Sequence, residues 1–212
     1  MEKTVQRGLV AGAVVAGAAL IGGAFYVLQE RQTEEPDFRA LKTDGDFQIR
    51  EYGAMTVAET VVQGPRKSAL SQGFEIIADY IFAKSRDGEK IAMTVPVTQD
   101  SGDPMASDPP LFDDDLEGAW RTRFVMPAGR TADDLPKAPD SIELVDLAPR
   151  KVAVVSFAGR ADDALLAEQE DRLRGWLARH GEKAGGEPEY AFYNSPIIPG
   201  PLRRNEVWLA VG

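Results

Sequence analysis

The sequence predicts an α+β fold built from two similar halves, each with the order strand-strand-helix-strand-strand. Two amphipathic helical patterns support this prediction, because the second begins about 95 residues after the first. A pair of strand-like segments precedes each helix, and another pair follows it. Two such halves are expected to pair their strands into one distorted antiparallel β-barrel with two flanking helices. A fold of this kind leaves a groove between helix and sheet that suits a ligand.

The first half contains two strand-like segments, 47–52 and 54–62, followed by a helix predicted over 68–83. Ser68 is the expected N-cap, because a serine side chain can accept a hydrogen bond from the first helical turn. Apolar residues recur on one stripe of the helix with spacings of three and four. These residues are Leu70, Phe74, Ile77 and Ile81.

A strand is predicted over 90–97, because apolar and other residues alternate there with a period of two. Ile91, Met93 and Val95 share its apolar face, and Pro96 is expected to end the strand or to place it at an edge. Residues 100–118 read as an acidic solvated loop. Its three adjacent aspartates do not have the spacing of a calcium-binding loop. A strand over 120–126 completes the half.

The second half repeats this order. Its helix is expected to begin at Asp162 or Asp163 and to end at His180, with Gly181 just beyond it. His180 is the only histidine in the chain, and its expected role is to bond free carbonyl groups at that helix end. The predicted strands are 142–147, 152–158, 189–194 and 206–211, with a proline-rich loop over 195–201.

The N-terminus carries a separate apolar signal. Residues 9–28 contain no charge and would be about 30 Å long as a helix, the thickness of a bilayer core. Lys3 and Arg7 precede this segment, so a cytoplasmic tail 1–8, a transmembrane signal-anchor 9–28 and a linker 29–35 are expected. The domain 36–212 would then lie outside the cytoplasm, in the periplasm if the protein is bacterial. The alternative is a cleaved signal peptide.

Composition excludes several functions. There is no cysteine, so disulfides, thiolate metal sites and a cysteine nucleophile are impossible. The net charge of −10 disfavours binding to nucleic acid. Nucleotide-binding glycine loops, GxSxG and HExxH motifs are absent from the sequence. The sequence therefore favours a binding protein over an enzyme.

The first helix and the strand after it provide the candidate binding surface. Phe74, Ile77, Ala78 and Ile81 on the helix, together with Met93 on the strand, would form an apolar wall. The alternative is that this stripe is simply part of the hydrophobic core.

Two motifs, KIAMTVPV at 90–97 and RRNEVWL at 203–209, resemble those of the SOUL/heme-binding protein family. The similarity extends over about residues 36–212. It implies a duplicated α+β domain that binds heme or another tetrapyrrole in a shallow apolar groove beside the first helix, without enzymatic activity. Ala78 and Asp79 stand where some members have a methionine followed by a lysine, and Pro199 stands where some have a basic residue.

The resemblance implies a set of site residues. Arg203 or Arg204 would pair with the carboxylates of the ligand, because charge-assisted hydrogen bonds from arginine suit carboxylates. The alternative is that this pair of arginines before a strand is a structural ion-pair site. The metal ligand is unknown, and the candidates are Met93, Tyr52, Tyr80 and Tyr193. The full set of ligand-binding residues is Phe74, Ile77, Ala78, Ile81, Met93, Tyr193, Arg203 and Arg204.

The sequence thus predicts a single-pass membrane protein whose outer domain binds heme or a related porphyrin non-covalently. The first alternative is a protein-interaction module on the same fold, with its groove filled by side chains and a protein partner held at the membrane. The second alternative is an enzyme of unrecognised chemistry.

Overall fold

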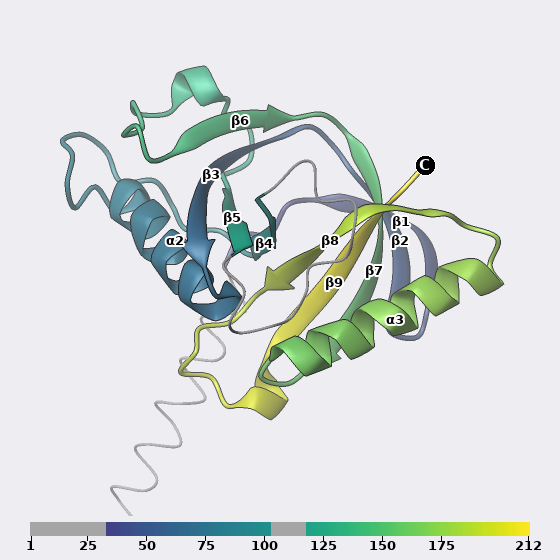
Figure 1. Cartoon of the computed structure of the whole chain (residues 1–212). Helices are drawn as coiled ribbons and strands as arrows, with labels where there is room; N and C mark the ends of the chain where they lie inside the picture. The colour runs from purple at the N-terminus through teal and green to yellow at the C-terminus, as the bar shows by residue number, and fades with distance from the viewer. Residues whose placement is uncertain (1–32, 103–117) are drawn as a thin grey trace, which may run out of the picture. The chain divides into compact units, whose positions relative to one another are not determined.

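The computed structural model describes residues 33–102 and 118–212, and residues from Glu34 to Gly212 form one compact unit (Figure 1). The predicted tail 1–8, the apolar segment 9–28 and the three adjacent aspartates of the acidic loop lie outside the described residues. Among the helices within the described ranges, none is long and apolar enough to cross a membrane. The anchor therefore stays a prediction from sequence.

Nine strands of the described residues form one antiparallel sheet in the order β1-β2-β7-β9-β8-β4-β5-β3-β6. Two α-helices and two short 3-10 helices accompany it. In chain order the elements are β1 (Phe38–Asp44), β2 (Phe47–Tyr52), β3 (Met55–Gly64), α2 (Arg66–Ile81), β4 (Val97–Ser101), β5 (Gly118–Val125), η1 (Ala132–Asp134), β6 (Glu143–Leu147), β7 (Arg150–Ala158), α3 (Asp163–Arg179), β8 (Ala184–Phe192), η2 (Gly200–Leu202) and β9 (Arg204–Val211).

The strand order has an internal symmetry. When β2, β3, β4 and β5 are exchanged for β6, β7, β8 and β9, the order from β2 to β6 is reproduced in reverse. The centre of this symmetry lies between β4 and β8, which pair at Val97 with Phe192 and at Gln99 with Tyr190. The first repeated strand of each half pairs with a strand of the other half, because β2 pairs with β7 and β6 pairs with β3. This is the arrangement expected of a duplicated chain.

The sheet is open, which corrects the predicted barrel. Its edges are β1 and β6, and no pairing joins them within the described part of the chain. The strand β1, which the sequence pattern did not reveal, pairs with β2 on the side away from β7 and so occupies the edge that closure would need. The mixed α+β class with two helices is confirmed, but a closed barrel is not.

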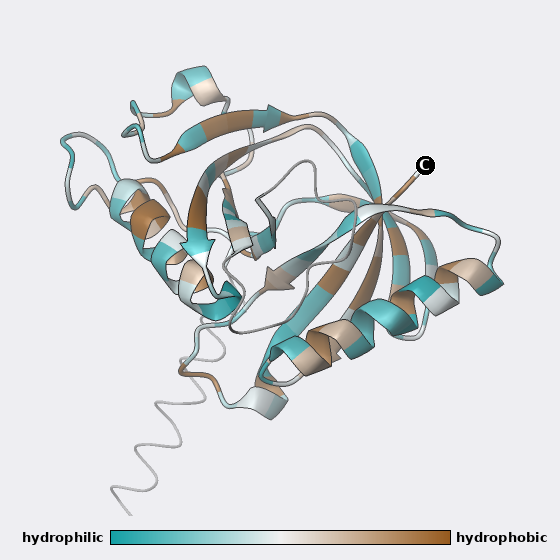
Figure 2. Cartoon of the chain, viewed as in Figure 1, coloured by the Kyte–Doolittle hydropathy of each residue, from teal (hydrophilic) through white to brown (hydrophobic). Residues whose placement is uncertain are grey.

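Both helices cover the same face of the sheet. The helix α2 packs on β3 and β5, and α3 packs on β7, β8 and β9. Trp120 and Phe124 are four residues apart on β5, so their side chains lie on the same face of the sheet. Trp120 belongs to the core cluster beneath α3, and Phe124 belongs to the core cluster beneath α2. Figure 2 shows hydrophobic and hydrophilic residues interleaved along both helices, as amphipathic packing requires. Within the described residues, neither helix packs on the other face of the sheet, which we call the helix-free face.

The predicted strand over 90–97 is wrong. Only Thr94 forms an isolated bridge, to Glu34, and the strand β4 begins at Val97, where the prediction ended it. The backbone groups before Val97 find other partners, because Ile91 N–H donates to the Ile81 carbonyl at 2.8 Å. The Thr94 hydroxyl donates to the Val125 carbonyl. These partners come from separate elements, so no strand ladder forms.

Candidate functional site

Most of the predicted apolar wall on α2 faces the protein interior. Ile77 and Ile81 are 0% and 1% exposed, and they pack in the core beneath α2 with Phe124. Ala78 is buried as well. Phe74 differs from these residues because 37% of it is exposed. Its ring packs in a tilted arrangement against that of Phe124, with a distance of 5.3 Å between the ring centroids. Phe74 is therefore the member of the wall on α2 that a ligand can reach directly.

Met93 lies on the segment that connects α2 to β4. It is half-buried and packs against the same core cluster that receives Ile77 and Phe124. Two residues later, Val95 belongs to a different cluster, which contains Tyr193 and Trp208 on the helix-free face of the sheet. The segment around Met93 thus joins the surface beside α2 to the opposite side of the sheet.

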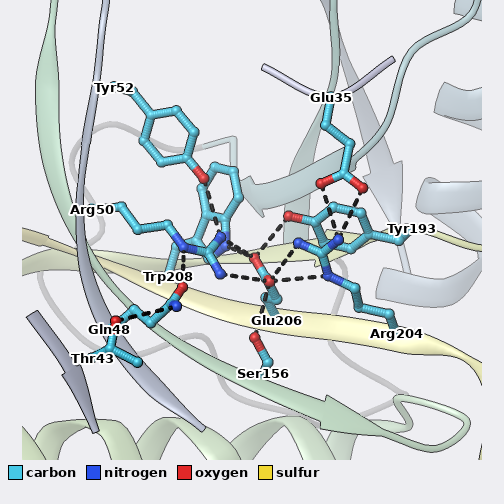
Figure 3. Close-up of polar contacts among 10 residues, drawn as sticks. All are labelled: Glu35, Thr43, Gln48, Arg50, Tyr52, Ser156, Tyr193, Arg204, Glu206 and Trp208. Carbon is cyan, nitrogen blue, oxygen red and sulfur yellow. Dashed lines mark hydrogen bonds and ion pairs between the residues drawn. The ribbon is translucent and has the colours of Figure 1, made fainter. Parts of the chain in front are cut away.

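A buried carboxylate organises the helix-free face. Figure 3 shows Glu206 of β9 at the centre of a group of polar side chains, most of them from β2, β7 and β9, with Tyr193 from the residue after β8. The side chain of Glu206 is 0% exposed, and its two oxygens accept hydrogen bonds with lengths between 2.7 and 3.3 Å. The donors are Arg50, Ser156, Tyr193, Arg204 and Trp208.

Charge stabilises this carboxylate in its ionised form. Burial alone would raise the pKa of Glu206, but the hydrogen bonds and positive charges of Arg50 and Arg204 hold that pKa below its ordinary value of 4.5. Burial opposes the charge of Arg50 too, yet Glu206 raises the pKa of Arg50 overall. Because its oxygens already accept so many hydrogen bonds, Glu206 is suited to orienting its neighbours and not to transferring protons.

Arg204 extends from this buried centre to the surface. Its Nε and Nη2 atoms donate to Glu206 Oε1 at 3.3 and 3.0 Å. Its guanidinium lies over the ring of Tyr193, with the central carbon 3.7 Å from the ring centroid. The remaining Nη1 atom donates to both carboxylate oxygens of Glu35, at 2.9 and 3.0 Å. Arg204 is thus held by a buried acid, an aromatic face and a surface acid (Figure 3).

Arg203 has a structural role in the described contacts. Its Nε donates to the Ile198 carbonyl at 2.7 Å, and its Nη2 donates to the Pro196 carbonyl. Both carbonyls belong to the proline-rich loop between β8 and β9. The two neighbouring arginines of the sequence motif therefore have different contacts. Arg203 bonds to backbone carbonyls of the loop, whereas Arg204 forms ion pairs with Glu35 and Glu206.

The residues before β1 lie against this region. The Glu34 carbonyl accepts a hydrogen bond from Val95 N–H at 2.9 Å, and its side chain accepts one from Ala128 N–H at 2.7 Å. The next residue is Glu35, the partner of Arg204. Residues 29–35 are predicted from the sequence as a linker, and the ion pair of Glu35 with Arg204 is visible only in the fold, because these residues are 169 positions apart.

The three tyrosines considered as iron ligands are all buried. The Tyr80 hydroxyl donates to the Pro136 carbonyl at 2.6 Å, and the Tyr193 hydroxyl donates to Glu206 at 2.8 Å. Burial raises the pKa of Tyr52, Tyr80 and Tyr193 above the ordinary value of 10. Tyrosines that stay protonated and buried are poor partners for iron. Met93, which is half-buried, is the more accessible of the candidate ligands.

A cavity of about 400 Å³, which the sequence did not suggest, lies at the C-terminal end of α2. Its basic residues are Arg86 and Lys137. Arg86 is already engaged, since its guanidinium donates to the carbonyls of Tyr80, Asp87 and Glu89. The lining residues are Tyr80, Ser85, Arg86, Lys137, Ala138, Pro139 and Asp140.

The remaining chemistry is limited. In the two described ranges, no three acidic or histidine side chains are grouped so that they could hold a metal ion. His180 caps α3, with Nδ1 2.8 Å from the Trp176 carbonyl oxygen and its ring 4.6 Å from that of Trp176 between centroids. This confirms the structural role predicted for the histidine.

Comparison with known proteins supports a family assignment. Residues 33–210 match the family model described as SOUL heme-binding protein. Human Heme-binding protein 2 (Homo sapiens) is 29% identical over 170 residues, which are 78% of this chain and 78% of the human protein.

Solved structures with low sequence identity share the fold. The C-terminal domain of EcmrR is 13% identical with a TM-score of 0.57, over 78% of this chain and 96% of that one. An uncharacterized conserved protein from Listeria innocua is 11% identical with a TM-score of 0.57, over 79% and 92% of the two chains. A hydrolase from Listeria innocua is 11% identical with a TM-score of 0.53, over 81% and 94%.

Proposed function

Because the chain belongs to the SOUL heme-binding protein family, we propose that its folded domain binds heme or a related tetrapyrrole reversibly and catalyses no reaction. The observation that carries this proposal is the extent of the family match, which reaches from before β1 into β9. A role in binding also agrees with Glu206 and His180, which are both engaged in structural contacts.

The proposed binding surface lies beside α2 and uses the apolar groups that remain accessible there. Phe74 is partly exposed, and Met93 is half-buried against the same core cluster. Covering about 300 Å² of apolar surface would contribute about 7 kcal/mol before the costs of association. Micromolar affinity requires about 8 kcal/mol after those costs, so the apolar surface alone is not enough, and charge-assisted hydrogen bonds to the ligand carboxylates have to contribute as well.

The described residues fit a tetrapyrrole in two respects. Phe74 and Met93 suit the apolar ring, and Arg204 suits a ligand carboxylate. Strong ligation of the iron is not expected, because the candidate tyrosines are buried and stay protonated. The affinity should therefore depend on the ring and the carboxylates, and metal-free protoporphyrin should bind about as well as hemin.

A titration of the full-length protein tests the proposal. Hemin and metal-free protoporphyrin IX are added separately, and the Soret band and the quenching of tryptophan fluorescence are followed. Phe74→Ala should weaken binding of both ligands by about tenfold, because the accessible ring is lost. The matched control is Val61→Ala on β3, since Val61 is also apolar and 51% exposed.

Saturable binding that weakens in Phe74→Ala and not in Val61→Ala is the expected result. Binding that is saturable but equal in both variants would place the ligand elsewhere, and Lys137→Gln at the cavity beyond α2 would then be tested. Absence of saturable binding to either porphyrin would refute the proposal.

The proline-rich loop favours a second candidate function, a protein-interaction module. Ile197 is 78% exposed and Leu202 is 52% exposed, while Arg203 fixes the loop that carries them. A rigid loop with exposed apolar side chains loses little conformational entropy when it binds a partner. This alternative predicts that Ile197→Ser abolishes the capture of a partner and leaves porphyrin titrations unchanged.

We also propose the membrane location that the sequence suggests. A helix over 9–28 would anchor the chain with its folded domain outside the cytoplasm. Fractionation of cells that express the full chain tests this, because an uncleaved anchor keeps the protein with membranes after washing at high salt and high pH. Release of the whole protein by that wash would refute the anchor.

A further inference from the structure

We infer that Glu35 occupies a carboxylate-binding position at Arg204, and that a carboxylate of the bound ligand replaces Glu35 there. This inference rests on the proposed function, because it names the residue with which the tetrapyrrole competes. It makes Glu35 an internal competitor that sets the affinity of the domain for anionic ligands.

The arginine is fixed before any ligand arrives. The fully buried Glu206 accepts from two of its nitrogens, and Tyr193 lies 3.7 Å from its central carbon. Only Nη1 is directed to the surface, where it meets Glu35. A guanidinium held in this way loses little freedom when it binds a carboxylate, which favours affinity.

Local charge also favours an acid at this position. The buried group combines two arginines, Arg50 and Arg204, with the one carboxylate of Glu206. Without Glu35, this group of three charged side chains has a net charge of +1. Glu35 supplies the balancing charge in the structure, and a ligand carboxylate would supply the same charge in its place.

Glu35 is the replaceable partner. Its side chain is 35% exposed, whereas the other acid on Arg204 is 0% exposed. Exposed ion pairs contribute little to stability, so exchange of one carboxylate for another has a small cost. The backbone need not move, because Glu34 has its own contacts with Val95 and Ala128.

The position also adjoins the proposed binding surface. Glu34 pairs with Thr94, and Met93 is the residue before Thr94. The segment that carries Glu35 therefore runs beside the segment that carries Met93. A ligand with an apolar ring and an acidic side chain would place its ring along the segment of Met93 and its carboxylate at Arg204.

The test compares a porphyrin acid with its ester in the full-length protein. Protoporphyrin IX carries two carboxylates, and its dimethyl ester carries none. Glu35→Gln removes the competing charge and should tighten the binding of protoporphyrin IX by about fivefold or more. The dimethyl ester should bind Glu35→Gln and the unmodified protein equally well.

The matched control is Asp37→Asn. Asp37 carries the same charge two residues away, is exposed, and has no hydrogen bond or ion pair to the described residues. The Asp37→Asn variant changes the net charge without removing a contact of Arg204. Its affinity for protoporphyrin IX should therefore stay close to that of the unmodified protein. Urea unfolding of both variants verifies that they fold.

Each outcome is decisive. An equal gain in Glu35→Gln and Asp37→Asn, or an equal gain for acid and ester, overturns the competition and leaves the proposed function standing. Binding of protoporphyrin IX that Glu35→Gln does not change has the same meaning. If neither porphyrin binds any variant, the proposed function and this inference both fail.

Discussion

Arg66 and Asp163, the first residues of α2 and α3, form an ion pair that joins the two halves of the chain. They are 97 residues apart, which is close to the spacing of about 95 residues predicted between the two helices. The guanidinium of Arg66 also donates to the Gln99 side chain on β4 at 3.0 Å and to the Ala161 carbonyl at 3.3 Å. The N-termini of both helices thus meet beside the central β4–β8 pair (Figure 1).

Arg66→Gln should lower the free energy of unfolding by about 3 kcal/mol, because it leaves buried acceptors without their donor. The measurement is urea unfolding followed by tryptophan fluorescence. Lys67→Ala is the matched control, since Lys67 lies 3.7 Å from the same carboxylate but is 58% exposed. It should cost less than about 1 kcal/mol. Equal losses in the two variants would contradict the structural role of Arg66.

Glu206→Gln should destabilise the fold by about 3 kcal/mol near neutral pH, because Arg50 then remains buried without its counter-charge. The size of this loss should depend on pH. The native pKa of Glu206 lies below 4.5, so its ionised form stabilises the fold fully above pH 4.5. That contribution disappears as the pH falls through the native pKa.

Urea midpoints of the unmodified protein and Glu206→Gln should therefore converge as the pH falls below 4.5. Asp100 acts in the opposite direction, because burial raises its pKa despite Arg121 and Arg123. Asp100 is present in both proteins, so its effect cancels in the comparison. A difference between the two proteins that stays constant from pH 7 to pH 3 would show that the ionised form of Glu206 is not what stabilises the fold.

The tyrosines provide a second test of burial. Burial raises the pKa of each of the four tyrosines in the described residues above 10. Their protonated forms therefore stabilise the native state at neutral pH, and this contribution is lost as the pH rises above 10. In an ultraviolet titration these four should ionise only as the chain unfolds. Ionisation near pH 10 with native circular dichroism would contradict the burial. The four residues are Tyr52, Tyr80, Tyr190 and Tyr193.

The helices were predictable because their signals are local. The first was expected over 68–83 and lies over Arg66–Ile81, and Asp162 caps the second by accepting from Leu165 N–H at 3.0 Å. The predicted Ser68 cap is wrong, because α2 begins two residues earlier and has no side-chain cap. Contacts of Arg66 with the other half of the chain hold that helix end, and such contacts leave no trace in a local pattern.

Strand partners and the site depend on contacts between distant residues, which explains the failures. The alternation over 90–97 resembled a strand, but its backbone groups bond to α2 and to Glu34. In the candidate site, Arg50 and Glu206 are 156 residues apart, and only the fold shows that they meet. The sequence motif at 203–209 contains Glu206 and indicates β9 as part of the site, but it does not reveal which distant residues Glu206 contacts.

Two helical glycines should respond in opposite ways to replacement by alanine. A β-carbon on Gly73 in α2 would lie 2.5 Å from Thr122 Oγ1 and 2.8 Å from Thr122 Cβ. Both positions are too close for real contacts, so α2 would have to move away from β5. A β-carbon on Gly175 in α3 would meet only the end of the Arg179 side chain, at 3.5 Å.

Alanine has a higher helix propensity than glycine by about 1 kcal/mol. Gly175→Ala should therefore raise the free energy of unfolding by up to that amount. Gly73→Ala gains the same propensity, but overpacking typically costs about 1–3 kcal/mol, so the net change should be a loss. Urea unfolding of both variants measures the difference. A stabilising Gly73→Ala would show that α2 does not pack on β5 as closely as the structure indicates.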